Sequence, residues 1–203
     1  MTMKPSIRKL ALTAHVTASV GWLGALAVFL AHALASLFSQ DDQTVRAASL
    51  AMGLAAWFVI LPLSLASLVT GLVQALGAAW GLLRHYWILF KLLLTAVATI
   101  VLLLKLAPIS YLTEMAAQAT FSSADLRGLR TSLMVHAAGG LLMLLAAAGL
   151  AVYKPVGTTR HGFAGTPRWV KVFGAIVLAL IVLVGVMLVA GGHGPRAHIS
   201  HLS

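Results

Sequence analysis

The sequence contains no cysteine, and only 9% of its 203 residues are charged. The absence of cysteine excludes disulfides, iron–sulfur clusters and thiolate metal sites, so any metal would need His, Met, Lys, Tyr or carboxylate ligands. Only four residues are acidic, and none of them lies within a long apolar stretch. This argues against an ordinary proton-coupled transporter. The sequence also lacks a catalytic triad, a phosphate-binding glycine loop and an HExxH helix, which excludes the common hydrolases and nucleotide-using enzymes.

Hydrophobic residues make up 61% of the chain, and its mean hydropathy is +1.00. This composition predicts an all-α integral membrane bundle that forms a single transmembrane domain. Because a span needs about 20 apolar residues, we expect a kinked or tilted helix in the longest stretch, which contains Pro62. A polar extramembrane segment is predicted at 111–131 and a polar tail at 193–203. Five spans are expected, at 10–38, 47–81, 86–109, 132–153 and 170–192.

The basic residues are distributed unequally between the two predicted sides of the membrane. The side of the N-terminus has nine basic residues and no acid, whereas the other side has five basic residues together with all four acids. The positive-inside rule therefore places the N-terminus in the cytoplasm, as for a multi-pass protein of the bacterial inner membrane. Membrane orientation also explains the net charge of +10 better than nucleic-acid binding does.

His136 is the most unusual residue, because it lies near the start of the apolar stretch 132–149. An ionisable side chain at membrane depth is costly and usually faces the interior of a helix bundle, so it indicates a functional site. The residues that follow it, from Ala137 to Gly140, are small. They leave room for a neighbouring helix or for a flat cofactor, and the sequence favours neither.

His15 is a second histidine within a span, and it shares one helix face with Ser19 and Trp22. A ligand role and a hydrogen bond to a hydroxyl or carbonyl of a neighbouring span carry equal weight for it. For Gln74, the sequence favours an interhelical hydrogen bond over a substrate contact.

The segment 80–91, WGLLRHYWILFK, combines aromatic and basic residues at the predicted cytoplasmic turn between two spans. Its composition favours an aromatic belt at the membrane interface, in which Trp87 would take part. The alternative is an anion-binding site in which Arg84, His85 and Lys91 neutralise haem propionates or a lipid phosphate. The tail histidines His193, His198 and His201 could collect a metal, but a disordered tail is favoured.

Several segments resemble a bacterial family of predicted integral membrane proteins of unknown function: HVTASVGWLG, PLSLASLVTGLVQALGAAWG, RHYWILFKLLLT and VHAAGGLLMLL followed by VYKP. The histidine of the first span, the WxG-like pattern after it and the lysine that opens the third span are similar to HemJ-type protoporphyrinogen oxidases and CopD-like copper-resistance proteins. The resemblance implies that His15 binds b-type haem and that Lys91 matches the third-helix lysine of the HemJ-type proteins. The family of unknown function often has histidine at the position of Lys105, and a neutral lysine can also bind iron.

Depth limits how the two membrane histidines could share one iron. His15 lies about six residues inside the cytoplasmic boundary of the membrane, and His136 lies about six residues inside the outer boundary. Across a core of about 20 residues their depths differ by about eight residues, or roughly 12 Å. Two axial nitrogens must lie only about 4 Å apart. Tilt could close the gap, there could be two sites, or each histidine could have another partner. The other partners considered are Lys105, Met134 or Met143 for His136, and His85 for His15.

The sequence therefore predicts a membrane protein that binds b-type haem and serves electron transfer or a haem-dependent redox reaction, which leaves an oxidoreductase activity open. We expect His136 and His15 as ligands and Arg84 and Lys91 facing the propionates, with His85 also in the cofactor site. Trp22 and Trp87 are expected near the ring edge or at the cytoplasmic interface. The expected partners are the lipid bilayer, a quinone or a redox protein, and a second copy of the chain. The alternatives are a copper- or cation-binding transport protein without a redox role, and a purely structural role for the histidines.

Overall fold

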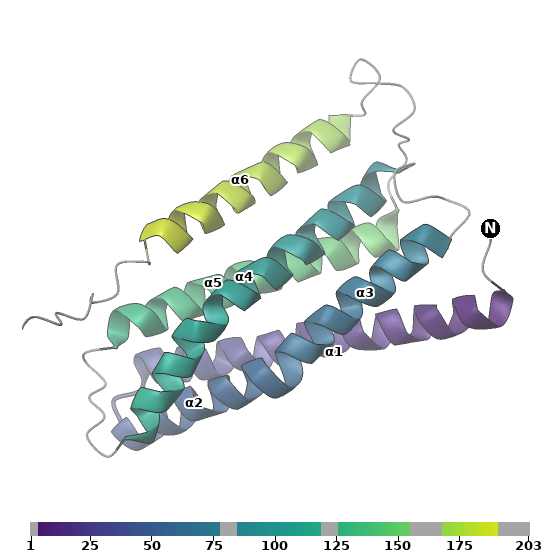
Figure 1. Cartoon of the computed structure of the whole chain (residues 1–203). Helices are drawn as coiled ribbons and strands as arrows, with labels where there is room; N and C mark the ends of the chain where they lie inside the picture. The colour runs from purple at the N-terminus through teal and green to yellow at the C-terminus, as the bar shows by residue number, and fades with distance from the viewer. Residues whose placement is uncertain (1–3, 78–84, 119–125, 155–167, 191–203) are drawn as a thin grey trace, which may run out of the picture.

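The computed structural model describes residues 4–77, 85–118, 126–154 and 168–190, and within these ranges the chain is helical, with no β-strand. This confirms the predicted all-α class. Five helical rods run alongside one another (Figure 1). Four are single helices, and the fifth rod joins α2, η1 and α3 end to end. The bounds are α1 Pro5–Phe38, α2 Asp42–Ala55, η1 Ala56–Ile60, α3 Leu61–Gly77, α4 Tyr86–Ala117, α5 Arg127–Tyr153 and α6 Arg168–Ala190.

Four of the rods surround a shared core. Helix α1 packs against α2, α3 and α5, and α4 packs against α2, α3 and α5. Helix α6 lies outside this bundle against α4 and α5 (Figure 1). Its contact with α4 includes Phe90 and Trp169, whose ring centroids are 6.3 Å apart in an edge-to-face arrangement. The core positions of α1 recur every three or four residues, from His15 to Ser36, as expected of a helix that buries one face.

The outside of the bundle is apolar and its inside is partly polar, which is the reverse of a water-soluble protein. Large hydrophobic side chains such as Val16, Val20 and Phe58 are exposed, whereas His15, Ser67 and His136 are buried. Four rods are long and apolar enough to cross a membrane: Pro5–Phe38, Asp42–Leu76, Tyr86–Ala117 and Arg127–Tyr153. Length and composition thus indicate a multi-pass membrane protein. Helix α6 occupies the place of the predicted fifth span, and its crossing stays a prediction.

The rod that contains Pro62 is irregular just before the proline. Residues Ala56–Ile60 form a π-helical turn, in which the N–H of Leu61 donates to the carbonyl of Ala56, five residues back. Proline has no N–H and its ring collides with the carbonyl four residues earlier, so a wider turn accommodates it. The sequence predicted a kinked or tilted helix here, and the irregularity that the structure contains is this turn.

The helices at the end of the bundle opposite the N-terminus are longer than the predicted spans. Helix α4 continues past Pro108 to Ala117, and α5 begins at Arg127, so both enter the predicted extramembrane segment 111–131. The reason is packing: Leu112 and Ala116 are fully buried and continue the core face of α4.

The same end carries polar groups that satisfy helix termini. The carboxylate of Asp41 caps α2 by accepting hydrogen bonds from the N–H groups of Gln43 and Thr44 and from the Thr44 hydroxyl. These bonds, above all that from the Thr44 hydroxyl, lower the pKa of Asp41. The Arg46 guanidinium donates to the Ala117 carbonyl at the end of α4, at 2.9 Å, and the buried Arg130 donates to the Ser36 carbonyl at the end of α1. Two arginines therefore cap helices other than their own.

Candidate functional site

His136 lies on the core side of α5 with 8% of its surface exposed. Its Nδ1 is 2.7 Å from the backbone carbonyl of Ser132, one helical turn earlier. Because a carbonyl only accepts hydrogen bonds, Nδ1 carries the proton, and in the neutral ring Nε2 then has a free electron pair. Nε2 is buried and has no hydrogen-bond partner among the residues that the structure describes. A buried nitrogen with a free electron pair and no hydrogen-bond partner in the described part of the chain requires an explanation.

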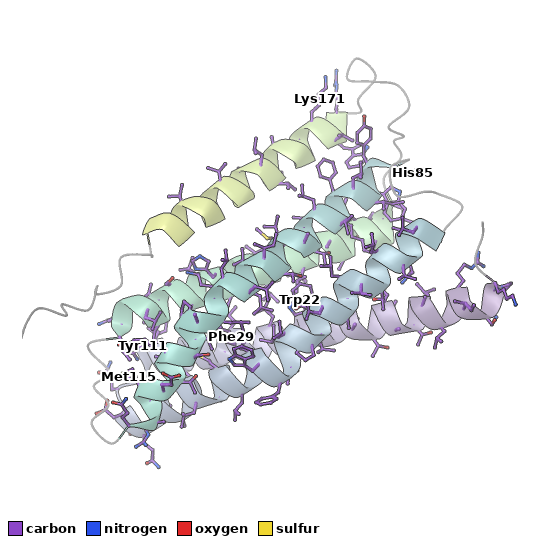
Figure 2. All side chains as sticks on the ribbon, viewed as in Figure 1. Trp22, Phe29, His85, Tyr111, Met115 and Lys171 are labelled. Carbon is purple, nitrogen blue, oxygen red and sulfur yellow. The ribbon has the colours of Figure 1, made fainter. Side chains whose placement is uncertain are left out.

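His136 lines a partly open cavity of about 50 Å³ between α1, the α2–α3 rod, α4 and α5. Trp22 and Phe29 project from α1 into the interior of the bundle (Figure 2), and both line this cavity. Apart from His136 and Lys105, the lining side chains are apolar. They are Trp22, Leu26, Phe29, Ile60, Ala98, Val101, Leu102, Ile109, Leu133 and Ala137, together with the backbone of Gly140.

Lys105 is the second polar group of the cavity, and it too is buried, with 9% of its surface exposed. Its Nζ donates to the hydroxyl of Ser132 at 3.3 Å. Ser132 therefore contacts both polar groups, through its carbonyl to His136 and through its hydroxyl to Lys105. Lys105 also lies close enough to His136 to act on it electrostatically. Of the partners considered for His136 from the sequence, the structure places Lys105 beside it.

His15 lies in a different polar cluster, at the contact between α1 and α3. Its Nδ1 is 3.0 Å from the carbonyl of Ser67 and 3.2 Å from the hydroxyl of Thr70. The Ser19 and Ser67 hydroxyls are 2.7 Å apart. Lys91 of α4 is close enough to act electrostatically on the His15 ring. The hydrogen bonds match the structural alternative that the sequence left open for His15.

The two membrane histidines do not line the same cavity. Trp22 lines the cavity of His136, and His15 lies seven residues earlier on α1, about 10 Å along the helix axis. Likewise, Lys91 and Lys105 are 14 residues apart on α4, or about 21 Å. His136 and Lys105 thus line one cavity, whereas His15 and Lys91 do not line it.

The other predicted site residues lie near the start of α4 or outside the described ranges. His85 is half-buried, and its ring centroid is 6.5 Å from that of the half-buried Trp87. His85 and Lys171 lie at one end of the bundle and Tyr111 and Met115 at the other (Figure 2). Arg84 and the tail histidines His193, His198 and His201 lie outside the described residues.

Two further predictions concern helix contacts and metal ligands. The predicted interhelical role of Gln74 is confirmed, because its Nε2 donates to the Ala11 carbonyl of α1 at 3.1 Å. In the part of the chain that the structure describes, no group of three or more His, Cys, Asp or Glu side chains could hold a metal ion.

Sequence reasoning missed the double role of Ser132 and the contributions of Phe29 and Ile60 to the cavity. The spacing of Ser132 and His136, four residues apart in a helix, was a signal for the first. The sequence held no comparable signal for Phe29 or Ile60, because the cavity depends on how four rods pack.

No family model, no curated protein and no solved structure matches this chain. The resemblance to HemJ-type and CopD-like proteins therefore stays a prediction.

Proposed function

We propose that this chain is a membrane-embedded haem-binding protein in which Nε2 of His136 binds the iron of b-type haem and that it serves electron transfer or a haem-dependent redox reaction. The observation that supports this proposal is the buried Nε2 of His136, which has no hydrogen-bond partner among the described residues, in a side chain that lines a cavity. A histidine that ligates a metal typically donates its other ring N–H to a carbonyl or carboxylate, as Nδ1 of His136 does to Ser132.

The histidine nitrogen is a suitable ligand for haem iron, but the cavity is smaller than a haem. A single water molecule needs about 10–15 Å³ of cavity volume, so a cavity of about 50 Å³ accommodates only a few waters. Binding haem therefore requires the lining side chains or helices to move apart, and the apolar lining with Trp22 and Phe29 would then cover the ring. Haem bound at His136 would be nearer to Lys105 than to His85 or Lys91, so a haem ligated by His15 would occupy a second site.

Visible spectra of the protein, purified in detergent after expression with ample haem, test the proposal. The parent protein should have a Soret band that shifts on reduction with dithionite. We expect His136→Ala to lose this band, whereas His15→Ala, the matched control in the other cluster, should retain it. The absence of a Soret band from a folded parent protein would refute haem binding. Loss of the band in His15→Ala but not in His136→Ala would move the ligand to His15.

Copper or another cation is the second candidate ligand, and the small size of the cavity favours it. A volume of about 50 Å³ suits one ion with its remaining waters better than a macrocycle. Isothermal titration of the haem-free protein with copper and with zinc distinguishes the candidates. Saturable copper binding that His136→Ala abolishes, without any chromophore in the parent, would replace haem by a copper site.

The membrane arrangement belongs to the same proposal. We infer five spans in the bacterial inner membrane with the N-terminus in the cytoplasm, because the basic helix ends of α1 and α6 lie at one end of the bundle (Figure 1). A quinone or a redox protein is the proposed electron partner. Reporter fusions after Lys154 and after Ser203 should report cytoplasmic and periplasmic locations, respectively. The same location for both would exclude a fifth span.

A further inference from the structure

Lys105 has more hydrogen-bond donors than the structure uses. A lysine ammonium carries three N–H donors. Within the described part of the chain, Nζ of Lys105 makes one hydrogen bond, to the Ser132 hydroxyl at 3.3 Å. The side chain is nine-tenths buried and lines the cavity beside His136. Its remaining donors are therefore available to a molecule inside the cavity.

No carboxylate of the described residues faces Lys105. Asp41, Asp42 and Glu114 are all exposed, at the end of the bundle where α2 begins and α4 ends, and the fourth acid, Asp125, lies outside the described ranges. The residues that line the cavity include no acid. Buried charges are normally paired or hydrogen-bonded, because an isolated charge in an apolar environment is very costly. When it is protonated, the Lys105 ammonium therefore has no counter-charge among the described residues.

We propose that Lys105 binds a carboxylate group inside this cavity, next to His136. The carboxylate would accept hydrogen bonds from Nζ and supply the missing negative charge, while the Ser132 hydroxyl holds the lysine in place. The carboxylate has two potential sources: a haem propionate, or a free small carboxylate that enters the cavity. Only the first source rests on the proposed haem function.

Formate is a suitable probe, because it is the smallest carboxylate. The melting temperature of the full-length, haem-free protein in detergent is measured against increasing sodium formate. Two controls separate carboxylate binding from general effects: formamide is a neutral molecule of similar shape, and sodium gluconate supplies a carboxylate too large for the cavity at the same ionic strength. Formate should raise the melting temperature in proportion to the logarithm of its concentration above the Kd, and neither control should do so.

Variants assign the effect to Lys105. Lys105→Met should lose the entire formate-dependent shift, and it should fold, because replacing a buried unpaired charge by an apolar side chain of similar volume is neutral or stabilising. Lys91→Met removes the other lysine of α4, which does not line the cavity, and this variant should keep the formate-dependent shift in melting temperature. An unchanged shift in Lys105→Met, or no formate shift in the parent, would overturn the proposal even if the Soret band is present.

Haem titrations identify the source of the carboxylate. If a propionate binds Lys105, Lys105→Met should weaken the binding of haem by about tenfold or more and leave the binding of haem dimethyl ester unchanged, since a hydrogen bond to a charged group is lost only in the first case. If both haems bind the parent and the variant equally while formate still requires Lys105, the source is a free small carboxylate. Haem that fails to bind the parent refutes the haem function alone, because the formate measurement does not need it.

Discussion

Replacing Gly71 by alanine tests how tightly α1 and α3 are packed around His15. A Cβ at this position would lie 3.0 Å from Cε1 and 3.4 Å from Nδ1 of the His15 ring. The ring cannot easily withdraw, because Nδ1 is bonded to Ser67 and Thr70. Overpacking of this kind costs about 1–3 kcal/mol, against which alanine gains about 0.5–1 kcal/mol over glycine in a helix. We expect Gly71→Ala to lower the free energy of unfolding by about 0–2.5 kcal/mol, and by about 1–3 kcal/mol relative to an unhindered glycine-to-alanine change.

Equilibrium unfolding in mixed micelles measures this change, and two further variants isolate its cause. Gly24→Ala is the matched control, since a Cβ there meets nothing within 4 Å, and it should be neutral or stabilising. In a His15→Ala background, Gly71→Ala should no longer destabilise, so the double-mutant cycle should show a coupling of about 1–3 kcal/mol. If Gly71→Ala is as stable as Gly24→Ala, or if the cycle is additive, the packing argument is wrong.

Three further predictions concern polar groups at the helix ends and contacts. Arg130→Met should reduce the free energy of unfolding by about 1.5–3 kcal/mol in the same assay, because a charged donor to the Ser36 carbonyl is lost; full stability would contradict the capping role. Gln74→Met should cost only about 0.6 kcal/mol, since it removes one interhelical bond to Ala11 within a membrane, and a loss above 2 kcal/mol would point to a further role. Because the pKa of Asp41 is lowered in the folded protein, its carboxylate contributes stability above pH 4 that is lost as the pH falls through the folded pKa. Between pH 7 and pH 3, the melting temperature should therefore fall more steeply for the parent than for Asp41→Asn. An equal dependence of the melting temperature on pH in both proteins would refute this.

The positions of the membrane helices could be predicted from the sequence, but their ends could not. Apolar stretches determine where a chain crosses a membrane, and all four rods identified as long and apolar enough correspond to predicted spans. The ends depend on tertiary packing. Leu112 and Ala116 keep α4 helical beyond the predicted boundary because they meet core residues of other rods, which the local composition cannot reveal.

The candidate site was predictable only in part, for a similar reason. An ionisable residue in an apolar stretch is conspicuous, and this identified both His15 and His136. Hydropathy does not fix how far each helix is rotated about its axis. The sequence therefore could not tell that His15 contacts Ser67, whereas Nε2 of His136 has no hydrogen-bond partner among the described residues. The sequence indicates Lys105 as a possible partner of His136 but does not place it in a cavity. Its contact with Ser132 joins two helices across 27 residues of sequence, which local composition does not reveal.

The π-helical turn Ala56–Ile60 also determines how far α3 is rotated about the rod axis relative to α2. A π turn accommodates one residue more than the α-helix around it, and each residue of an α-helix turns the chain by about 100°. Removing one residue here would restore regular α-helix and rotate α3 by about 100° relative to α2, so Ser67 and Gly71 would turn away from His15. The number of residues in this turn is therefore constrained independently of their identity, because a single deletion would change how the polar cluster around His15 is placed relative to the capped helix ends at the other end of the bundle.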